Sequence, residues 1–248
     1  TFDQYFFMRY ADPEQHIRLR FKGDCVKLLK EFLPIFNSWA MELKDIGILS
    51  KFSIETYNPE TERYGGPELL SLAEQVFFHD SELISNWIYL NRFGNSVFST
   101  EALGIINVID YASHFIEDFQ KQLDWFNTVT SYKNFGKEFR EKRSLYMKIG
   151  NNNNDWHSLK SYDGGDELYH NLKKRSKYIK EYVNKMKSTN LIFNHPDNIM
   201  GSFIHLSLNR LIGIDRHYEE KIMTMSRHTL HNLRVIKQKK GLQINVEI

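Results

Sequence analysis

The stretch that decides the fold is Phe6-Phe7-Met8-Arg9-Tyr10-Ala11-Asp12-Pro13-Glu14-Gln15-His16-Ile17-Arg18-Leu19-Arg20-Phe21, near the start of the chain. Its second half alternates between a polar and an apolar set: His16, Arg18 and Arg20 against Ile17, Leu19 and Phe21. Side chains of a β-strand point alternately to opposite faces, so the polar set forms a row with neighbours about 7 Å apart, and the apolar set anchors that row in the core. The planar fork of arginine suits carboxylate or phosphate. A solvated strand face is the more common arrangement of such residues, and an anion-binding row is the alternative.

The residues around this stretch predict a small sheet and one helix. Residues 5–10 and 16–22 have strand patterns and are joined by a turn at Asp12-Pro13-Glu14. Apolar residues then recur at helical spacing up to residue 47, with Asp24 as a candidate N-cap and a kink at Pro34. Residues 48–57 return to strand-like alternation. The order strand, helix, strand predicts an α/β unit, with a right-handed crossover if the strands are parallel.

Helical patterns dominate after a loop over residues 58–66. We expect Pro67 to start a helix, because proline suits the first helical position, and Ser81 to cap the next helix. Residues 100–130 are predicted as one long amphipathic helix. The Asn-rich segment 150–155 is predicted as a polar loop between two helices.

The last third of the chain is also helical. Residues 166–187 predict a basic helix whose lysines and Arg175 form a solvated face, and residues 198–236 predict one or two closing helices. We therefore expect an α+β fold, in which a small N-terminal mixed sheet packs against a predominantly helical remainder. Residues 1–248 are expected to form a single domain.

Composition excludes several classes of protein. The 248 residues are 41% hydrophobic and 14% aromatic, as in globular chains, and the net charge of +2 is too small to indicate nucleic acid as a direct partner. Cys25 is the single cysteine, which excludes an internal disulfide and a cysteine-based zinc site. No apolar run approaches 18 residues and no segment resembles a signal peptide, so we expect a cytoplasmic protein without a membrane span. Because the chain starts at Thr1 rather than Met, we expect it to be part of a longer polypeptide.

Common catalytic and cofactor motifs are absent from the sequence. It contains no Walker-type phosphate loop, no G-x-G-x-x-G fingerprint, no H-E-x-x-H and no G-x-S-x-G elbow. His228 and His231 have helical metal-ligand spacing, as do His217 and Glu220, but ten histidines produce such pairs by chance. We expect neither a cofactor nor a metal ion.

A polar seam crosses an otherwise apolar helix pattern near the C-terminus. Four-residue spacing places His205 over Asn209, and Ser202 lies one turn earlier. Polar groups on a buried helix face must be paired, so one interpretation is a core histidine satisfied by Asn209 or by a backbone carbonyl. The alternative is a general base, because histidine side chains titrate near neutral pH. The residues alone leave both open.

Three stretches resemble one known family when taken together. They are FFMRYADPEQHIRLRF at 6–21, ETYNPETERYGGPELLSLAEQVFFHDSE at 55–82 and SFIHLSLNRLIGIDRHYEE at 202–220. In this order they resemble the C-terminal elimination domain of class I lanthipeptide dehydratases, the LanB type. The same domain type also occurs as a separate polypeptide in thiopeptide pathways, and the pyridine synthases of those pathways resemble it more distantly. The region at about 95–195 matches only in being helical.

The resemblance implies a reaction and its partners. In this family a Ser or Thr of a precursor peptide is first esterified with glutamate from glutamyl-tRNA by a large partner domain. The elimination domain then removes glutamate and leaves dehydroalanine or dehydrobutyrine, which is a lyase-type β-elimination. The implied partners are the glutamylated precursor peptide and a glutamylation domain or subunit, either fused or separate.

The resemblance also implies the site residues. By motif, the functional residues of the family fall on Arg18, Arg20, Glu60, Arg63 and His205. His205 is the expected base, and Arg20 and Arg63 are expected to hold the glutamyl carboxylates and the leaving group, with Arg18 in support. Glu60 either binds the glutamyl ammonium or orients an arginine. Asn209 is a further candidate for substrate binding.

Two other functions remain open at this point. The first is a pyridine synthase-like enzyme, which joins two dehydroalanines in a formal cycloaddition and needs no glutamyl ester. The second is a non-catalytic module, in which the arginine row only binds a peptide or carboxylate partner. The sequence is compatible with a homo-oligomer and with a biosynthetic complex at the membrane.

Overall fold

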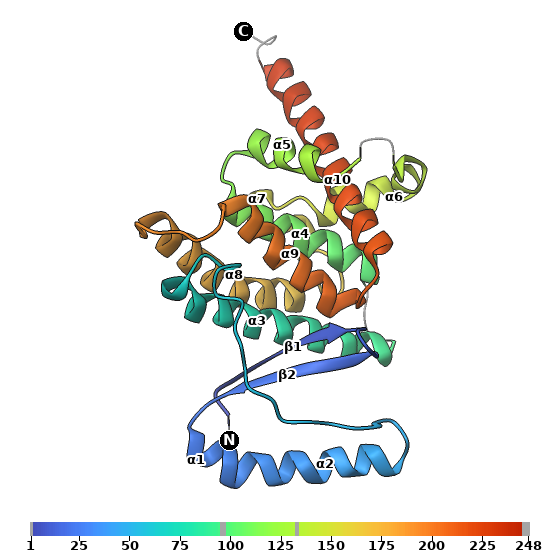
Figure 1. Cartoon of the computed structure of the whole chain (residues 1–248). Helices are drawn as coiled ribbons and strands as arrows, with labels where there is room; N and C mark the ends of the chain where they lie inside the picture. Colours follow the sequence, from blue (N-terminus) through green and yellow to red (C-terminus); the bar gives the residue numbers. More distant parts are fainter. Residues whose placement is uncertain (1, 95–97, 132–133, 245–248) are drawn as a thin grey trace.

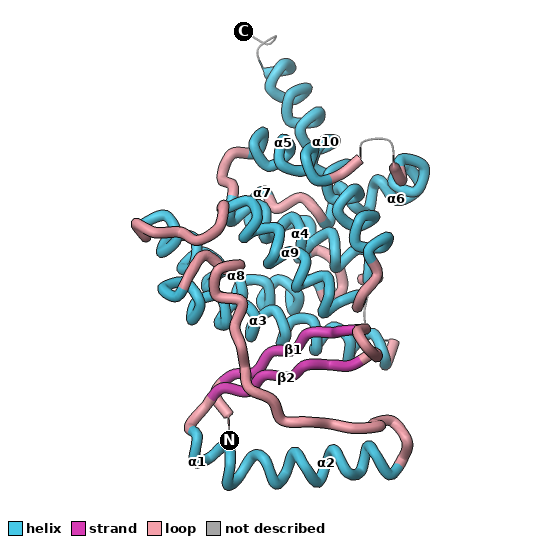
Figure 2. Tube along the Cα trace, viewed as in Figure 1, coloured by secondary structure: helices cyan, strands magenta, loops and turns pink. Residues whose placement is uncertain are grey.

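A computed structural model describes residues 2–94, 98–131 and 134–244 of the chain. A β-hairpin is followed by a long series of helices (Figures 1 and 2). The elements are β1 (Gln4–Tyr10), β2 (His16–Lys22), α1 (Cys25–Lys27), the π-helical turn η1 (Leu28–Phe32), α2 (Leu33–Asp45), α3 (Pro67–Arg92), α4 (Thr100–Phe115), α5 (Phe119–Val129), α6 (Gly136–Ile149), α7 (Asn153–Lys160), α8 (Gly165–Ser188), α9 (Pro196–Ile212) and α10 (Arg216–Ile244).

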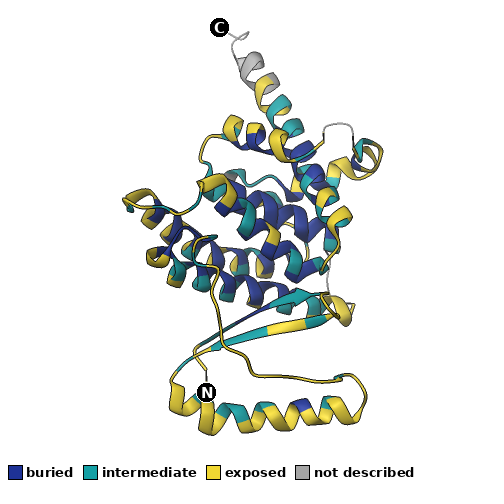
Figure 3. Cartoon of the chain, viewed as in Figure 1, coloured by how far each residue is buried: buried dark blue, intermediate teal, exposed yellow. Residues whose placement is uncertain are grey.

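The hairpin lies between the helical bundle and α2 (Figure 1). On the bundle side, β1 packs against α3 and α9. On the other side, the ring of Phe21 in β2 lies 4.4 Å from that of Phe32 and 5.8 Å from that of Phe36. The apolar row of β2 is therefore divided: Phe21 packs on the N-terminal helices, Leu19 packs against the main core, and Ile17 is 62% exposed. Figure 3 shows that α2 itself is largely exposed.

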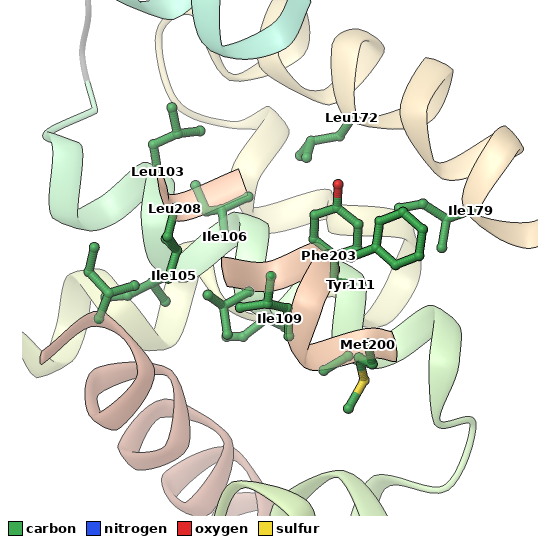
Figure 4. Packing of buried hydrophobic residues seen from close by; sticks show 14 of the residues in the cluster. Leu103, Ile105, Ile106, Ile109, Tyr111, Leu172, Ile179, Met200, Phe203 and Leu208 are labelled. Atoms are coloured by element: carbon green, nitrogen blue, oxygen red, sulfur yellow. The ribbon is translucent and has the colours of Figure 1, made fainter. Parts of the chain in front are cut away.

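The centre of the bundle is α4, which packs against α8, α9 and α10. Nearly every residue of its first three turns is buried, because this helix is apolar on most of its faces. Ile106 and Ile109 of α4 belong to the same buried cluster as Phe203 and Leu208 of α9 (Figure 4). This packing fixes α9, the helix that carries several candidate site residues.

The outer edge of β1 is bound to the bundle by side chains. The backbone N–H of Phe7 donates to Ser81 Oγ at 3.3 Å, and its carbonyl accepts from Arg210 Nε at 2.8 Å. The N–H and carbonyl of Arg9 bind the amide of Asn209, both at 2.9 Å. Backbone groups of a strand edge need partners when they are buried, and here α3 and α9 supply them.

A buried ionic cluster joins α3, α4, α8 and α9. Asp80 accepts from Arg175 at 2.6 Å and from Arg210 at 2.8 Å, and Arg175 also donates to Asp110 at 2.7 Å. Burial alone would raise the pKa of Asp110, but the charges of His114 and Arg175 lower this pKa to about 2. The predicted solvated position of Arg175 is wrong, because its side chain is fully buried between these carboxylates.

The α+β class and the N-terminal position of the sheet are confirmed, but the described sheet consists of two antiparallel strands. The strand predicted over residues 48–57 is wrong, and with it the α/β unit. This segment has no regular structure, and Ile48 and Ile54 are 72% and 71% exposed. The edge of β1 is already occupied by side chains of the bundle, so a further strand cannot pair there.

Helix starts were predicted more accurately than helix continuity. Asp24 does cap the first helix, since its Oδ1 accepts from Lys27 N–H at 2.9 Å, and Pro67 is the first residue of α3. Ser81 is not a cap: it lies inside α3 and its hydroxyl donates to the carbonyl of Phe77.

Two further boundaries differ from the predicted ones. The helix expected over 100–130 ends at Phe115 and restarts at Phe119, where Asp118 caps α5 by accepting from Lys121 N–H at 2.8 Å. The Asn-rich loop is shorter than expected, because α7 begins at Asn153. Among the described residues, no helix has the length and apolar character needed to cross a membrane.

Candidate functional site

Three polar residues lie along one face of α9. Ser202, His205 and Asn209 are three and four residues apart, so their side chains leave the helix on the same side, over a length of about 10 Å. Phe203 and Leu206 between them are buried in the bundle core. The helix therefore fixes the spacing of this polar face.

The loop before α3 brings Arg63 to this face. Arg63 Nε donates to Ser202 Oγ at 3.1 Å, and its Nη1 donates to both carboxylate oxygens of Glu60, at 3.2 and 3.3 Å. The carbonyl of Arg63 accepts from Asn194 Nδ2 at 3.2 Å. Glu60 and Arg63 are thus brought together, with Arg63 held against α9.

The sequence Tyr64-Gly65-Gly66 fixes this loop. Tyr64 is 3% exposed, its ring lies 5.1 Å from that of Phe203, and its carbonyl accepts from Tyr182 Oη at 2.9 Å. Gly66 has a φ of 115°, which favours glycine, and a Cβ added there would lie 2.5 Å from Phe193. Both features position the loop so that Arg63 faces outward.

His205 is paired with a carboxylate of α10. Its Nδ1 lies 2.8 Å from Glu219 Oε1, and the two side chains are 48% and 25% exposed. The interpretation as a buried core histidine is therefore wrong. Sequence analysis missed Glu219: it lies fourteen residues after His205, and the turn between α9 and α10 that brings it back has no local signature for this contact.

The arginines of β2 lie on the hairpin. Arg18 stacks on Tyr10, with its guanidinium carbon 3.8 Å from the ring centre, and its Nε donates to His16 Nε2 at 3.2 Å. Arg20 lies 5.4 Å from the ring centre of Tyr57, and its Nη1 donates to the carbonyl of Leu19. Arg20 Nε is buried and has no hydrogen-bond partner among the residues that the structure describes.

The expected site residues thus form two groups. Among the described residues, no hydrogen bond or ion pair joins Arg18 or Arg20 to Arg63 or His205. Burial raises the pKa of Tyr64, which directly follows Arg63, to about 12, and the charges of Arg63, Arg210 and Glu60 also act on it.

Asn209 has a clear structural contact. Both ends of its amide bind the backbone of Arg9, so it connects α9 to β1. It therefore fixes the position of the hairpin relative to His205, one turn earlier on the same helix.

This arrangement combines a histidine held by a carboxylate with guanidinium groups that bind anions. The histidine offers a second ring nitrogen for proton transfer, and the arginines offer charge-assisted hydrogen bonds to carboxylates. No group of three or more His, Cys, Asp or Glu side chains in the described part of the chain is placed to hold a metal ion.

The sequence matches a known protein family over nearly its whole length. Residues 2–230 match the family model described as "Lantibiotic biosynthesis dehydratase C-term", and the chain belongs to this family. The subtilin biosynthesis protein SpaB of Bacillus subtilis is 37% identical over 97% of this chain, and the nisin biosynthesis protein NisB of Lactococcus lactis subsp. lactis is 32% identical over 88% of it.

The chain corresponds to only part of these relatives. It spans 24% of the length of SpaB and 21% of the length of NisB. The crystal structure of the tRNA-dependent lantibiotic dehydratase MibB from Microbispora sp. 107891 has the same fold, with a TM-score of 0.83 over 95% of this chain and 25% of that chain, at 22% sequence identity.

Proposed function

We propose that this chain eliminates glutamate from glutamylated Ser or Thr residues of a ribosomally made precursor peptide. The product is dehydroalanine from Ser or dehydrobutyrine from Thr. The observation that carries the proposal is the pair His205–Glu219 beside Arg63. Arg63 comes from the loop before α3 and is held by Ser202, which lies one turn before His205 on α9. A base and an anion-binding group at this spacing suit the removal of a proton next to a departing carboxylate.

His205 is the proposed base. Its Nδ1 faces the Glu219 carboxylate, which accepts a hydrogen bond, so we assign the ring proton to Nδ1 and the free lone pair to Nε2. Nε2 takes the Cα proton, the electrons form the Cα=Cβ double bond, and the Cβ–O bond breaks to release the glutamate carboxylate. Glu219 stabilises the imidazolium that forms, as a carboxylate does for the histidine of a catalytic triad.

The arginines are proposed to bind charge on the substrate. Arg63 and Arg20 hold the glutamyl carboxylates and neutralise the leaving group, and Arg18 supports the same site. Arg20 has a buried Nε donor without a partner in the described residues, which supports this role. Both carboxylate oxygens of Glu60 accept hydrogen bonds from Arg63. This contact favours a role for Glu60 in orienting Arg63 over a role in binding the glutamyl ammonium.

The remaining assignments follow from the same proposal. Residues 1–248 act as a single elimination domain, and the ester is formed by a glutamylation domain or subunit. The two other functions, cycloaddition between dehydroalanines and non-catalytic binding, become outcomes of the test. Asn209 is reassigned from substrate binding to holding β1 on α9.

The test is mass spectrometry of a glutamylated Ser/Thr peptide incubated with the chain. We expect loss of glutamate and a dehydrated residue, and we expect His205→Ala to leave the ester intact while circular dichroism shows a folded protein. The matched control is His157→Ala, a histidine on α7 that is not part of the site. An unchanged ester with folded wild-type chain refutes the proposal, and dehydrated peptide is then the substrate for testing cycloaddition.

A further inference from the structure

An open surface pocket of about 300 Å³, called the cavity below, lies between α5, α9 and α10. Its apolar wall consists of Trp125 and Val129 from α5, Ile204 from α9 and Met223 from α10. Gly201 of α9 also lines the cavity, and because glycine has no side chain it leaves this part of the cavity unfilled. Ligand pockets in proteins have volumes of about 300–1,000 Å³. This cavity is at the lower limit, so it suits one side chain of a larger ligand.

The cavity shares residues with the candidate site. Glu219, which binds His205, also lines the cavity. Ile204 directly precedes His205, and Gly201 directly precedes Ser202, which binds Arg63. A peptide that places its reacting residue at His205 therefore has this cavity within reach of its neighbouring side chains.

We propose that the cavity binds an apolar side chain of the precursor peptide, one or two residues from the Ser or Thr that loses glutamate; this inference rests on the proposed function. Gly201 and His205 are four residues apart on α9, which is about 6 Å along the helix axis. An extended peptide advances about 3.3 Å per residue, so this distance corresponds to one or two residues. The flexible Met223 and the planar Trp125 accommodate side chains of different shape.

The charged residues of the cavity argue against an acidic occupant. Arg216 contributes one positive charge, and Glu219 and Glu220 contribute two negative charges. An aspartate beside the reacting residue would bring a third carboxylate to this lining and would gain no apolar contact. The preferred neighbour is therefore a side chain such as leucine.

Gly201 allows the cavity to be filled without disturbing the core. A Cβ added at Gly201 would lie 3.9 Å from Trp125 Cζ2, which is ordinary van der Waals contact. Gly201→Ala then occupies a small part of the cavity, and Gly201→Leu extends a branched side chain along the apolar wall where the substrate side chain would lie. If Gly201→Leu fails to fold, Val129→Lys serves instead, because Val129 is 48% exposed and its replacement brings a charge into the apolar wall.

The experiment uses three glutamylated peptides that differ only beside the reacting residue, with Leu, Ala or Asp at that position. We expect the wild-type chain to eliminate glutamate from the Leu peptide roughly 10-fold faster than from the Ala peptide, and slowest from the Asp peptide. The ratio of the Leu rate to the Ala rate should fall partway in Gly201→Ala and approach 1 in Gly201→Leu. Equal wild-type rates for the three peptides, or an unchanged ratio in Gly201→Leu, would overturn the inference.

A binding measurement separates this inference from the proposed reaction. The affinities of the same three peptides without the glutamyl ester are measured by titration calorimetry with the wild-type chain and with Gly201→Leu. If no ester is eliminated but the Leu peptide binds more tightly than the Ala peptide, and only to the wild-type chain, the proposed reaction fails and the cavity assignment holds. If elimination occurs without any preference in rate or affinity, the cavity assignment fails and the reaction holds.

Discussion

Replacing Asp80 by alanine should destabilise the chain more than the loss of any exposed carboxylate. Asp80 is fully buried, and it accepts from Arg175 at 2.6 Å, Arg210 at 2.8 Å and Ser207 at 2.9 Å. Arg175 keeps Asp110 after the substitution, but Arg210 keeps only the carbonyl of Phe7 among its hydrogen bonds within the described residues. The substitution therefore leaves a buried guanidinium without a carboxylate.

The magnitude follows from this geometry. Removing one partner of a buried ion pair costs about 3–5 kcal/mol, and we expect about 4 kcal/mol because two arginines lose an acceptor. For a chain of this size, each kcal/mol lowers the midpoint of thermal unfolding by about 2–4 °C, so the expected decrease is about 8–16 °C.

The assay is urea unfolding followed by circular dichroism, together with a thermal scan. The matched control is Asp155→Ala, which also removes a carboxylate with several partners, Lys160, Lys173 and Tyr169. Its side chain is 53% exposed, so the control should change stability by at most about 1 kcal/mol. If Asp80→Ala is too unstable to purify, Asp80→Asn is measured instead. A loss of stability no greater than that of the control would refute the reasoning.

Three further predictions concern the site and its support. Glu219→Gln should lower kcat for elimination at least about 100-fold, because the Gln amide donates to His205 Nδ1 and moves the ring proton to Nε2; a Glu219→Gln rate within a few fold of wild type would contradict the assignment of the base. Ser202→Ala should cost about 1 kcal/mol of transition-state binding, roughly fivefold in kcat/KM, by freeing Arg63 Nε, and Ser202→Thr should restore most of it. Asp110 has a folded pKa of about 2, below its ordinary value, so the stability it contributes is present above pH 4 and is lost as the pH falls toward 2. Unfolding midpoints measured from pH 5 to 2 should fall less steeply in Asp110→Asn than in the wild-type chain, and parallel curves would count against this carboxylate.

The hairpin and the main helix starts could be predicted because their causes are local. Alternation at residues 16–21 favours a strand, and a short turn brings its pairing partner at residues 4–10 beside it, while Asp24 and Pro67 act on the first turn of their own helices. The alternation over residues 48–57 is equally regular, but a strand also needs a free edge to pair with. The outer edge of β1 is closed by Asn209 and Arg210, which are far away in the sequence, and residues 48–57 form no ladder with β2.

The sequence offered candidate site residues but not their arrangement. The resemblance pointed to Arg63 and His205, yet the contacts that hold them, with Ser202 and Glu219, depend on how three helices and a loop meet. Arg175 is a different case: it lies three residues after Leu172 and four before Ile179, so helical periodicity places it on the buried face of α8, while its carboxylate partners come from α3 and α4.

The closed edge of β1 also restricts how a peptide is recognised. Many proteins bind an extended peptide by adding it as a strand to a free sheet edge, where backbone hydrogen bonds supply affinity regardless of sequence. The backbone groups of Phe7 and Arg9 that face away from β2 are already bound to Ser81, Asn209 and Arg210. A substrate cannot add along this edge, so any selectivity that β1 contributes comes from its side chains and their charge. Protection of the Phe7 and Arg9 amides from hydrogen exchange should therefore be the same with and without bound peptide.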